Sequence, residues 1–196
     1  MDTLLIGTGN KHKLLEIQDI FKLNDIEFEL KIPSDFNITD EPIEDGKSFE
    51  ENAYIKSKFY FDKLHIPTIG EDSGICIDFY DAGPGIFSKR FLGHLSDHDK
   101  NEEILRQMSG SDKRKAVFHA VISYIDENGV NHIFEGINEG EIATKQSGNQ
   151  GFGYDPIFLI PSEGLTEADL GQDWKNRNSH RAKAFKKFID YYKSTR

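Results

Sequence analysis

Apolar and polar residues at the start of the chain follow the order strand, helix, strand. Residues 3–8 have the pattern of a short buried strand, and residues 28–32 predict a second one. Between them, residues 13–23 place large apolar side chains along one helical stripe: Leu14, Ile17 and Phe21. This β-α-β order is typical of an α/β fold with parallel strands.

A second helix is predicted from Ser48 to about Leu64. Ser48 is followed three residues later by Glu51, which is the spacing of a capping box. Asn52 and Lys56 then fall near one face of this helix. The helix could deliver Lys56 to an anion site, or Glu51 and Lys56 could be ordinary surface charges.

The remaining pattern adds a glycine-proline turn at residues 83–85 and a third helix over about residues 97–108. It also predicts four strands, at residues 68–70, 75–79, 116–125 and 132–138. The last two strands flank Asn128-Gly129, which is a strong hairpin signal. Turns are expected after them. The sequence therefore predicts an α/β fold with a mixed β-sheet, in which the hairpin introduces antiparallel pairing.

Length and charge limit the functional classes. The 196 residues suffice for a sizeable core, in one domain or two closely packed lobes. A net charge of −10 argues against sequence-independent binding of DNA or RNA. No leader is apparent, and the apolar stretch near residues 116–125 is too short to span a membrane. The single cysteine, Cys76, fits a reducing compartment and is expected to be a small buried residue without a nucleophilic role.

Charges are unevenly placed along the chain. Residues 34–51 contain seven acids against Lys47 alone, and residues 174–196 contain eight Lys or Arg against Asp190 alone. A basic wall opposite an acidic, metal-holding segment would suit a triphosphate with its cation. Much of the basic tail, over residues 183–193, is equally typical of a solvated helix face.

Three segments carry candidate chemistry, and the first lies near the C-terminus. Gly151-Phe152-Gly153 would let backbone approach a flat ligand while Phe152 offers a stacking face. Further along, three side chains offer hydrogen-bond donors: Lys175, His180 and Arg181. A phosphorylated nucleoside suits this combination. The alternative is a turning loop followed by a solvated basic helix, with His180 as its cap.

The second segment follows the first predicted strand, at Gly9-Asn10. A helix that begins here would present free N–H groups and a positive dipole end, and Lys13 would add a full charge. An anion would be stabilised at this point. A tight turn with a helix cap is the alternative, because the glycine spacings of a P-loop or a dinucleotide fingerprint are missing.

The third segment is Glu71-Asp72-Ser73-Gly74, expected at a strand end. Side chains alternate across a strand, so one of the two carboxylates would face a site while the other faces elsewhere. Asp72 is the better Mg²⁺ ligand, since that ion takes one or two carboxylates and completes its shell with water and phosphate. Taken alone, the segment is also typical of an acidic turn.

Together with further motifs, these segments resemble the inosine triphosphate pyrophosphatase family, also called Ham1. The ordered set spans roughly residues 3–190: Thr8-Gly-Asn10 with Lys13 and Glu16, Ser48-Phe-Glu-Glu-Asn52-Ala with Lys56, Asp72-Ser-Gly, Pro84-Gly with Ser88 and Arg90, Gly151-Phe-Gly-Tyr-Asp155-Pro, and Ser179-His-Arg181. The resemblance implies one domain over residues 1–196, with an elongated mixed sheet flanked by helices and two lobes around a central nucleotide-binding cleft. It also implies a cytoplasmic homodimer.

The resemblance further implies Mg²⁺-dependent hydrolysis of ITP, dITP and XTP to the monophosphate and pyrophosphate. Asp72 would bind the metal and serve as the catalytic base, with Glu44 as a second metal ligand. The implied substrate-binding residues are Thr8, Gly9, Asn10, Lys13, Lys56, Ser73, Phe152, Gly153, Tyr154, Asp155, Lys175, His180 and Arg181. Of these, Thr8, Asn10, Lys13, Lys56 and Ser73 would contact the phosphates.

This sequence departs from the family pattern at two positions. Ile43 stands where an acid is usual, so that Glu44 or Glu41 would substitute, or Asp72 and water would hold the metal alone. Glu71 replaces a more usual Asp and keeps the charge.

Base choice follows from hydrogen-bond donors, since Arg181 and His180 could satisfy the 6-keto oxygen of inosine or xanthosine and would face the amino donor of adenine. Two alternatives to this function are a related pyrophosphatase for pyrimidine or modified nucleotides and a nucleotide sensor without turnover.

Overall fold

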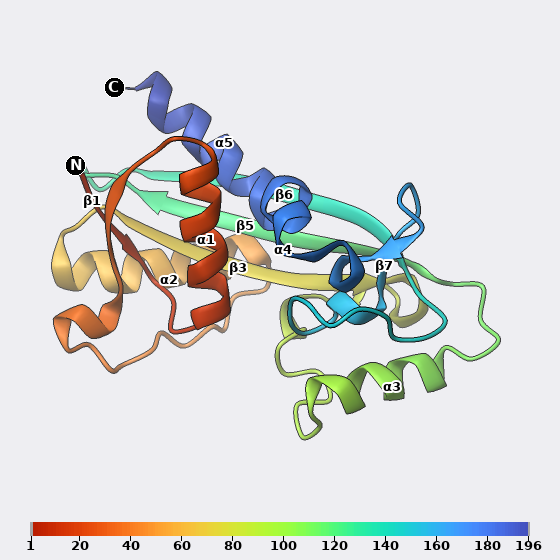
Figure 1. Cartoon of the computed structure of the whole chain (residues 1–196). Helices are drawn as coiled ribbons and strands as arrows, with labels where there is room; N and C mark the ends of the chain where they lie inside the picture. The colour runs from red at the N-terminus through yellow and green to blue at the C-terminus, as the bar shows by residue number, and fades with distance from the viewer. Residues whose placement is uncertain (1, 196) are drawn as a thin grey trace. The chain divides into compact units, whose positions relative to one another are not determined.

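The strands form one eight-stranded sheet in a computed structural model that describes residues 2–195 (Figure 1). The strands are β1 Asp2–Ile6, β2 Phe28–Lys31, β3 Thr68–Ile77, β4 Gly83–Pro84, β5 Lys115–Ile125, β6 Asn131–Ile142, β7 Phe158–Ile160 and β8 Leu165–Thr166. Their order is β2-β1-β3-β5-β6-β7-β8, and β4 pairs with β3. Parallel pairing of β1 with β2 and β3, and antiparallel pairing along β6, β7 and β8, confirm the predicted mixed α/β sheet.

The helices are α1 Lys11–Leu23, α2 Phe49–Leu64, α3 Asp97–Gln107, α4 Glu167–Asn178 and α5 His180–Ser194. Four short 3₁₀ turns lie at Pro33–Phe36, Asp78–Tyr80, Gly85–Phe87 and Asp155–Ile157. Ser48 caps α2 by accepting the N–H of Glu51, as predicted. The Glu51 carboxylate, however, accepts the N–H of Lys47, one residue before the position that a capping box uses. Within residues 2–195, no helix combines the length and apolar character needed to cross a membrane.

The chain divides into two compact units. The first contains the described residues up to Asp72, Ala120–Gly136 and the residues from Arg181 onward. The second contains Ser73–His119 and Ile137–His180. Strands β3, β5 and β6 have residues in both units.

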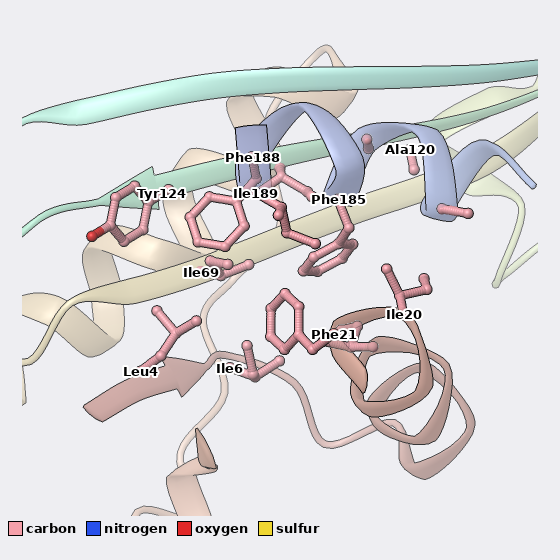
Figure 2. Close-up of a cluster of buried hydrophobic side chains, with 14 residues drawn as sticks. Leu4, Ile6, Ile20, Phe21, Ile69, Ala120, Tyr124, Phe185, Phe188 and Ile189 are labelled. Carbon is pink, nitrogen blue, oxygen red and sulfur yellow. The ribbon is translucent and has the colours of Figure 1, made fainter. Parts of the chain in front are cut away.

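The core of the first unit forms between α1, α5 and one face of the strands. Leu4 and Ile6 of β1 point into it, as alternate residues of a strand do, and Ile69 of β3 joins them. Helix α1 contributes Phe21, whose ring lies 5.5 Å from that of Phe185 in α5. Figure 2 shows these side chains converging from the two helices and the strands. This packing fixes the carboxyl end of β1 and the start of α1, where the predicted anion site lies.

The second unit has a separate core. It contains Ile75 and Ile77 of β3, Ile104 of α3, and Phe158 of β7. The ring of Phe118 in β5 lies 4.5 Å from that of Phe158. The core thus links α3 to the segment between β6 and β7, which contains the glycine-rich loop.

Two predictions of secondary structure are wrong. Residues 68–77 form one continuous strand, where two strands separated by Glu71-Asp72-Ser73-Gly74 are predicted. Neither Gly70 nor Gly74 has a positive φ, so both accept extended backbone. The predicted turns after β6 also contain α4, in which Gly171 is non-helical with φ 80°. Helix α4 begins at a capping box of Thr166 and Asp169.

Candidate active site

Alternation along β3 sends consecutive side chains to opposite faces. Ile69 and Glu71 face α1 and α5, because Ile69 belongs to the core there and Glu71 contacts Lys13 and Arg181. Asp72 contacts α2 on the other face. Glu71 and Asp72 are both buried. The two carboxylates therefore lie on opposite faces, as the alternation predicts, but both meet cations of the candidate set, whereas only one was expected to face a site.

Gly70 allows α2 to approach β3 closely. A Cβ atom at this residue would lie 2.2 Å from the carbonyl oxygen of Ala53 and 2.5 Å from the backbone nitrogen of Ser57. Only a residue without a side chain accommodates this distance. The Ser57 hydroxyl, one turn along, lies 2.6 Å from that of Ser123 in β5. The close approach places the side chains of α2 over Asp72.

Lys56 of α2 joins two carboxylates. Its Nζ lies 2.9 Å from Asp72 Oδ1 and 2.8 Å from Glu44 Oε2, and it also donates to the Glu71 carbonyl oxygen at 3.1 Å. Burial alone would lower the pKa of Lys56, but Asp72 and Glu44 outweigh it and raise the pKa above the ordinary value. Asn52, one helical turn earlier, donates to Asp72 Oδ2 at 3.3 Å. The two oxygens of Asp72 therefore have separate donors on one face of α2.

Glu71 is the centre of a second buried cluster. Its Oε1 accepts two hydrogen bonds from Arg181, at 3.1 and 2.9 Å, and its Oε2 lies 3.1 Å from Lys13 Nζ. Arg181 also pairs with Glu16 of α1. Burial disfavours the charge on Glu71, yet Arg181 and Lys13 hold its pKa well below the usual range. Burial lowers the pKa of Lys13, while Glu71 opposes this effect. The lysine is thus held beside a carboxylate that is ionised at neutral pH.

The loop before α1 is built as a helix cap. Asn10 Oδ1 accepts the N–H groups of His12 and Lys13, at 3.0 and 3.3 Å, and Thr8 Oγ1 accepts the N–H of Asn10. Helix α1 consequently starts at Lys11, two residues earlier than predicted. The segment Thr8–Lys11 forms one wall of a cavity of about 230 Å³.

In the second unit, Asp155 organises the glycine-rich loop. Its Oδ2 accepts the N–H of Phe152 at 2.8 Å and pairs with Lys175 Nζ at 2.7 Å. The same Nζ lies 4.9 Å from the centroid of the Phe152 ring. A Cβ atom at Gly151 would lie 2.1 Å from Asp155 Oδ2, and Gly151 has φ 79°, so this turn requires glycine. Lys175 and Asp155 are buried, so their ion pair connects the loop firmly to α4.

Tyr154 and His180 are also buried in the second unit. Tyr154 donates its hydroxyl to the Ser88 carbonyl oxygen at 2.7 Å, and burial raises its pKa. The His180 ring stacks on Phe118, with centroids 4.6 Å apart and an angle of 11° between the planes. His180 is the first residue of α5, whereas the alternative interpretation of the sequence has it as the helix cap.

The predicted site residues thus form groups within each unit. Lys56, Asp72 and Glu44 meet at one point of the first unit, and Lys13 meets Arg181 through Glu71. Phe152, Asp155 and Lys175 meet in the second unit, which also contains Ser73, Gly153, Tyr154 and His180. Sequence patterns alone give no role to Asn52 and do not pair Glu16 with Arg181. Asn52 lies four residues before Lys56, and Glu16 lies three residues after Lys13. This helical spacing is the signal in the sequence that points to the two residues.

Two observations address the remaining candidates. Ile43 is 80% exposed and Glu41 lies near Gly9, so the acid that reaches Lys56 is Glu44. Cys76 is half-buried, where the sequence predicts a buried residue, and burial raises the pKa of its thiol.

Known proteins resemble this chain over nearly its full length. The sequence matches the Ham1 family over residues 4–191. It is 41% identical to a dITP/XTP pyrophosphatase of Borreliella burgdorferi, with 96% of this chain and 94% of the relative covered. A dITP/XTP pyrophosphatase of Halalkalibacterium halodurans is 39% identical, covering 95% and 96%. The solved structure of a HAM1 protein from Coxiella burnetii superposes with a TM-score of 0.88 at 33% identity, over 99% and 100% of the two chains. The chain therefore belongs to the Ham1 family.

Proposed function

We propose that this chain is a dITP/XTP pyrophosphatase that hydrolyses ITP, dITP and XTP to the nucleoside monophosphate and pyrophosphate. The observation that carries the proposal is the pair of lysines anchored by adjacent carboxylates of β3, Lys13 by Glu71 and Lys56 by Asp72. The family membership and the relatives named dITP/XTP pyrophosphatases support it.

The phosphates are assigned to the first unit. The start of α1 provides a positive dipole end, and the ammonium group of Lys13 lies in its first turn. Lys56 adds a second ammonium group beside Asp72. Both cations would stabilise the charge that develops on the leaving pyrophosphate when the bond between the α-phosphorus and its bridging oxygen breaks. Thr8, Gly9, Asn10 and Ser73 are assigned to the same phosphates.

Asp72 is assigned as the base that activates water. Its carboxylate is buried, and Asn52 and Lys56 hold its two oxygens in a fixed orientation. In the reaction, water would transfer a proton to this carboxylate while its oxygen bonds to the α-phosphorus. The orientation supplied by Asn52 and Lys56 would reduce the reorganisation needed before attack.

The residues present fit a bound Mg²⁺. Glu44 Oε2 and Asp72 Oδ1 converge on one cation, the Lys56 ammonium, at 2.8 and 2.9 Å. Two converging carboxylates are what Mg²⁺ usually takes from a protein, with water and phosphate oxygens completing its shell. Among residues 2–195, no group of three or more metal-binding acids, histidines or cysteines occurs. When bound, Mg²⁺ would neutralise phosphate charge, and Glu44 and Asp72 are the residues that would hold it.

The purine ring of the nucleotide is assigned to the glycine-rich loop of the second unit and to the start of α5. Phe152 offers a stacking face, and Lys175 and Asp155 hold its loop. Gly153 and Tyr154 belong to the same loop. His180 and Arg181 are assigned to the 6-keto oxygen, which distinguishes inosine and xanthosine from adenine.

The family resemblance also supports a homodimer that works in the cytoplasm. The two-lobed single domain with its central cleft, predicted from the same resemblance, stays a prediction.

Pyrophosphate release from ITP, dITP, XTP, GTP, ATP and dTTP, with and without Mg²⁺, tests the proposed function. Metal-dependent release from the first three is expected, and preferred turnover of dTTP would support the pyrimidine alternative instead. Asp72→Asn should lower kcat on ITP by at least about a hundredfold at a temperature where the variant is folded, and it should also lower the thermal transition, because Lys56 loses a buried partner. Asp62→Asn is the matched control, because Asp62 is an exposed carboxylate of α2 whose partner is Lys58. Binding of ITP without turnover in the unmodified protein would favour the sensor.

A further inference from the structure

Two side chains at the start of α3 bind the backbone of Gly153, one at its N–H and the other at its carbonyl oxygen. Asp97 Oδ2 accepts the N–H of Gly153 at 3.2 Å, and Asn101 Nδ2 donates to its carbonyl oxygen at 2.9 Å. Asp97 and Asn101 are four residues apart and therefore lie on the same face of the helix. Asn101 is 1% exposed, so water competes little for its hydrogen bond.

A third residue of the same turn contacts the next residue of the loop. Lys100 Nζ lies 2.8 Å from Asp97 Oδ1 and 4.7 Å from the centroid of the Tyr154 ring. The Tyr154 hydroxyl is in turn bound to the Ser88 carbonyl oxygen. Helix α3 therefore holds Gly153 and Tyr154. Asp155 and Lys175 hold the preceding residue of the loop, Phe152.

Gly153 needs such support more than other residues would. It has φ 64°, and a Cβ atom placed on it would find no atom within 4 Å, so neither a side chain of its own nor a neighbour at the Cβ position restricts it. A glycine without restraint samples many conformations, and its neighbours move with it. Two hydrogen bonds to a helix remove this freedom and thereby set the direction of the adjacent Phe152.

We infer that Asp97 and Asn101 are positioning residues, which fix the Gly153 peptide and so aim the Phe152 ring at the nucleoside base. The inference rests on the proposed function, because it takes Phe152 as the stacking surface. Since stacking ignores base substituents, the two residues would serve all purine nucleotides alike and would not set the choice between them.

Steady-state kinetics of Asn101→Ala and Asp97→Ala test this role. Each variant should raise KM for ITP by roughly three- to tenfold and leave kcat within about twofold, and Asp97→Ala also removes the ion pair with Lys100. Asp99→Ala is the matched control, because Asp99 lies in the same turn and its carboxylate accepts from Ser96. It should leave KM unchanged.

A double-mutant cycle with Phe152→Ala separates positioning from general support of the fold. Phe152→Ala alone should raise KM by roughly fivefold or more. Adding Asn101→Ala should then raise KM no further, because Asn101 acts through the ring that has been removed. Equal increases in KM in both backgrounds would overturn the inference, as would wild-type KM values in both single variants.

Hydrogen–deuterium exchange provides a measurement that does not depend on turnover. The Gly153 amide should exchange several-fold faster in Asp97→Ala and Asn101→Ala than in the unmodified protein and in Asp99→Ala. Unchanged exchange in both variants would overturn the inference. An absence of ITP hydrolysis by the unmodified protein would overturn the proposed function instead, and the exchange result alone would then decide whether α3 holds the loop.

Discussion

Glu71 and Asp72 are neighbours in β3, and their carboxylates bind lysines on opposite faces of that strand. Glu71 pairs with Lys13 of α1, and Asp72 pairs with Lys56 of α2. A strand delivers consecutive side chains to opposite faces, so one dipeptide can anchor cations from two helices. The arrangement places one ammonium group on each face of the strand, and each is held by the carboxylate beside it.

Glu44→Gln should raise the Mg²⁺ concentration needed for half-maximal activity by roughly tenfold. The substitution removes one of the two carboxylate charges that converge on Lys56, and hard cations bind in proportion to ligand charge. Activity measured over a Mg²⁺ titration checks this. Glu41→Gln is the matched control and should leave the titration unchanged. A shift in Glu41→Gln without one in Glu44→Gln would make Glu41 the second ligand.

Gly70→Ala should destabilise the protein by about 1–3 kcal/mol and lower kcat/KM for ITP. The added methyl group would lie 2.2 Å from the Ala53 carbonyl oxygen, so α2 must move away from β3 and take Lys56 with it. Urea denaturation measures the first effect. Gly9→Ala is the control for stability, because its Cβ atom would lie 3.4 Å from the nearest atom, Glu41 Oε1. Equal stability of the two variants would contradict the close packing of α2 on β3.

Local signals predicted much of the fold. The Ser48 cap, the hairpin turn and the helix at α3 follow from residues adjacent in sequence, which is the range over which caps and turns act. The glycines of β3 predict a break in a strand that is in fact continuous, and the reason is physical. Gly70 is needed for close packing against α2, not for a turn, and a single sequence does not distinguish these two uses.

The sequence indicates which residues belong to the candidate site, but it does not indicate which of them contact one another. Arg181 and Glu71 are 110 positions apart, and their pairing depends on the packing of α5 against β3, which local patterns do not specify. The sequence does not indicate helix α4, because Gly171 interrupts it and because buried Glu167 and Lys175 resemble surface charges. Charged residues usually face water, and those that are buried with a partner are exceptions that a single sequence does not mark.

Glu71→Gln should change how stability depends on pH. The folded-state pKa of Glu71 lies well below its unfolded value of about 4.5, so the stabilisation from its charge is present above pH 4.5 and is lost as pH falls further. Loss of this buried partner of Arg181 and Lys13 should cost about 3–5 kcal/mol at pH 7. Below pH 4.5 the difference between the two proteins should shrink.

Urea denaturation at pH 7, 5 and 3.5 measures this difference. Glu50→Gln, which alters an exposed carboxylate of α2, should give a difference close to zero at each pH. A constant gap between the unmodified protein and Glu71→Gln across this range would show that the carboxylate charge contributes no pH-dependent stability.

Arg181→Lys should narrow the preference for ITP over ATP. The substitution keeps the positive charge for Glu71 and Glu16, but it replaces the planar fork of donors by one ammonium group. If these donors meet the 6-keto oxygen, kcat/KM for ITP should fall by roughly tenfold or more, and residual ATP turnover should fall much less. Kinetics on both nucleotides, together with the thermal transition, give the ratio and the stability. Arg177→Lys is the control, because Arg177 is an exposed residue of α4, and its ratio should be unchanged. Equal proportional losses on ITP and ATP would place Arg181 in the support of Glu71 and Lys13, with no contact to the base.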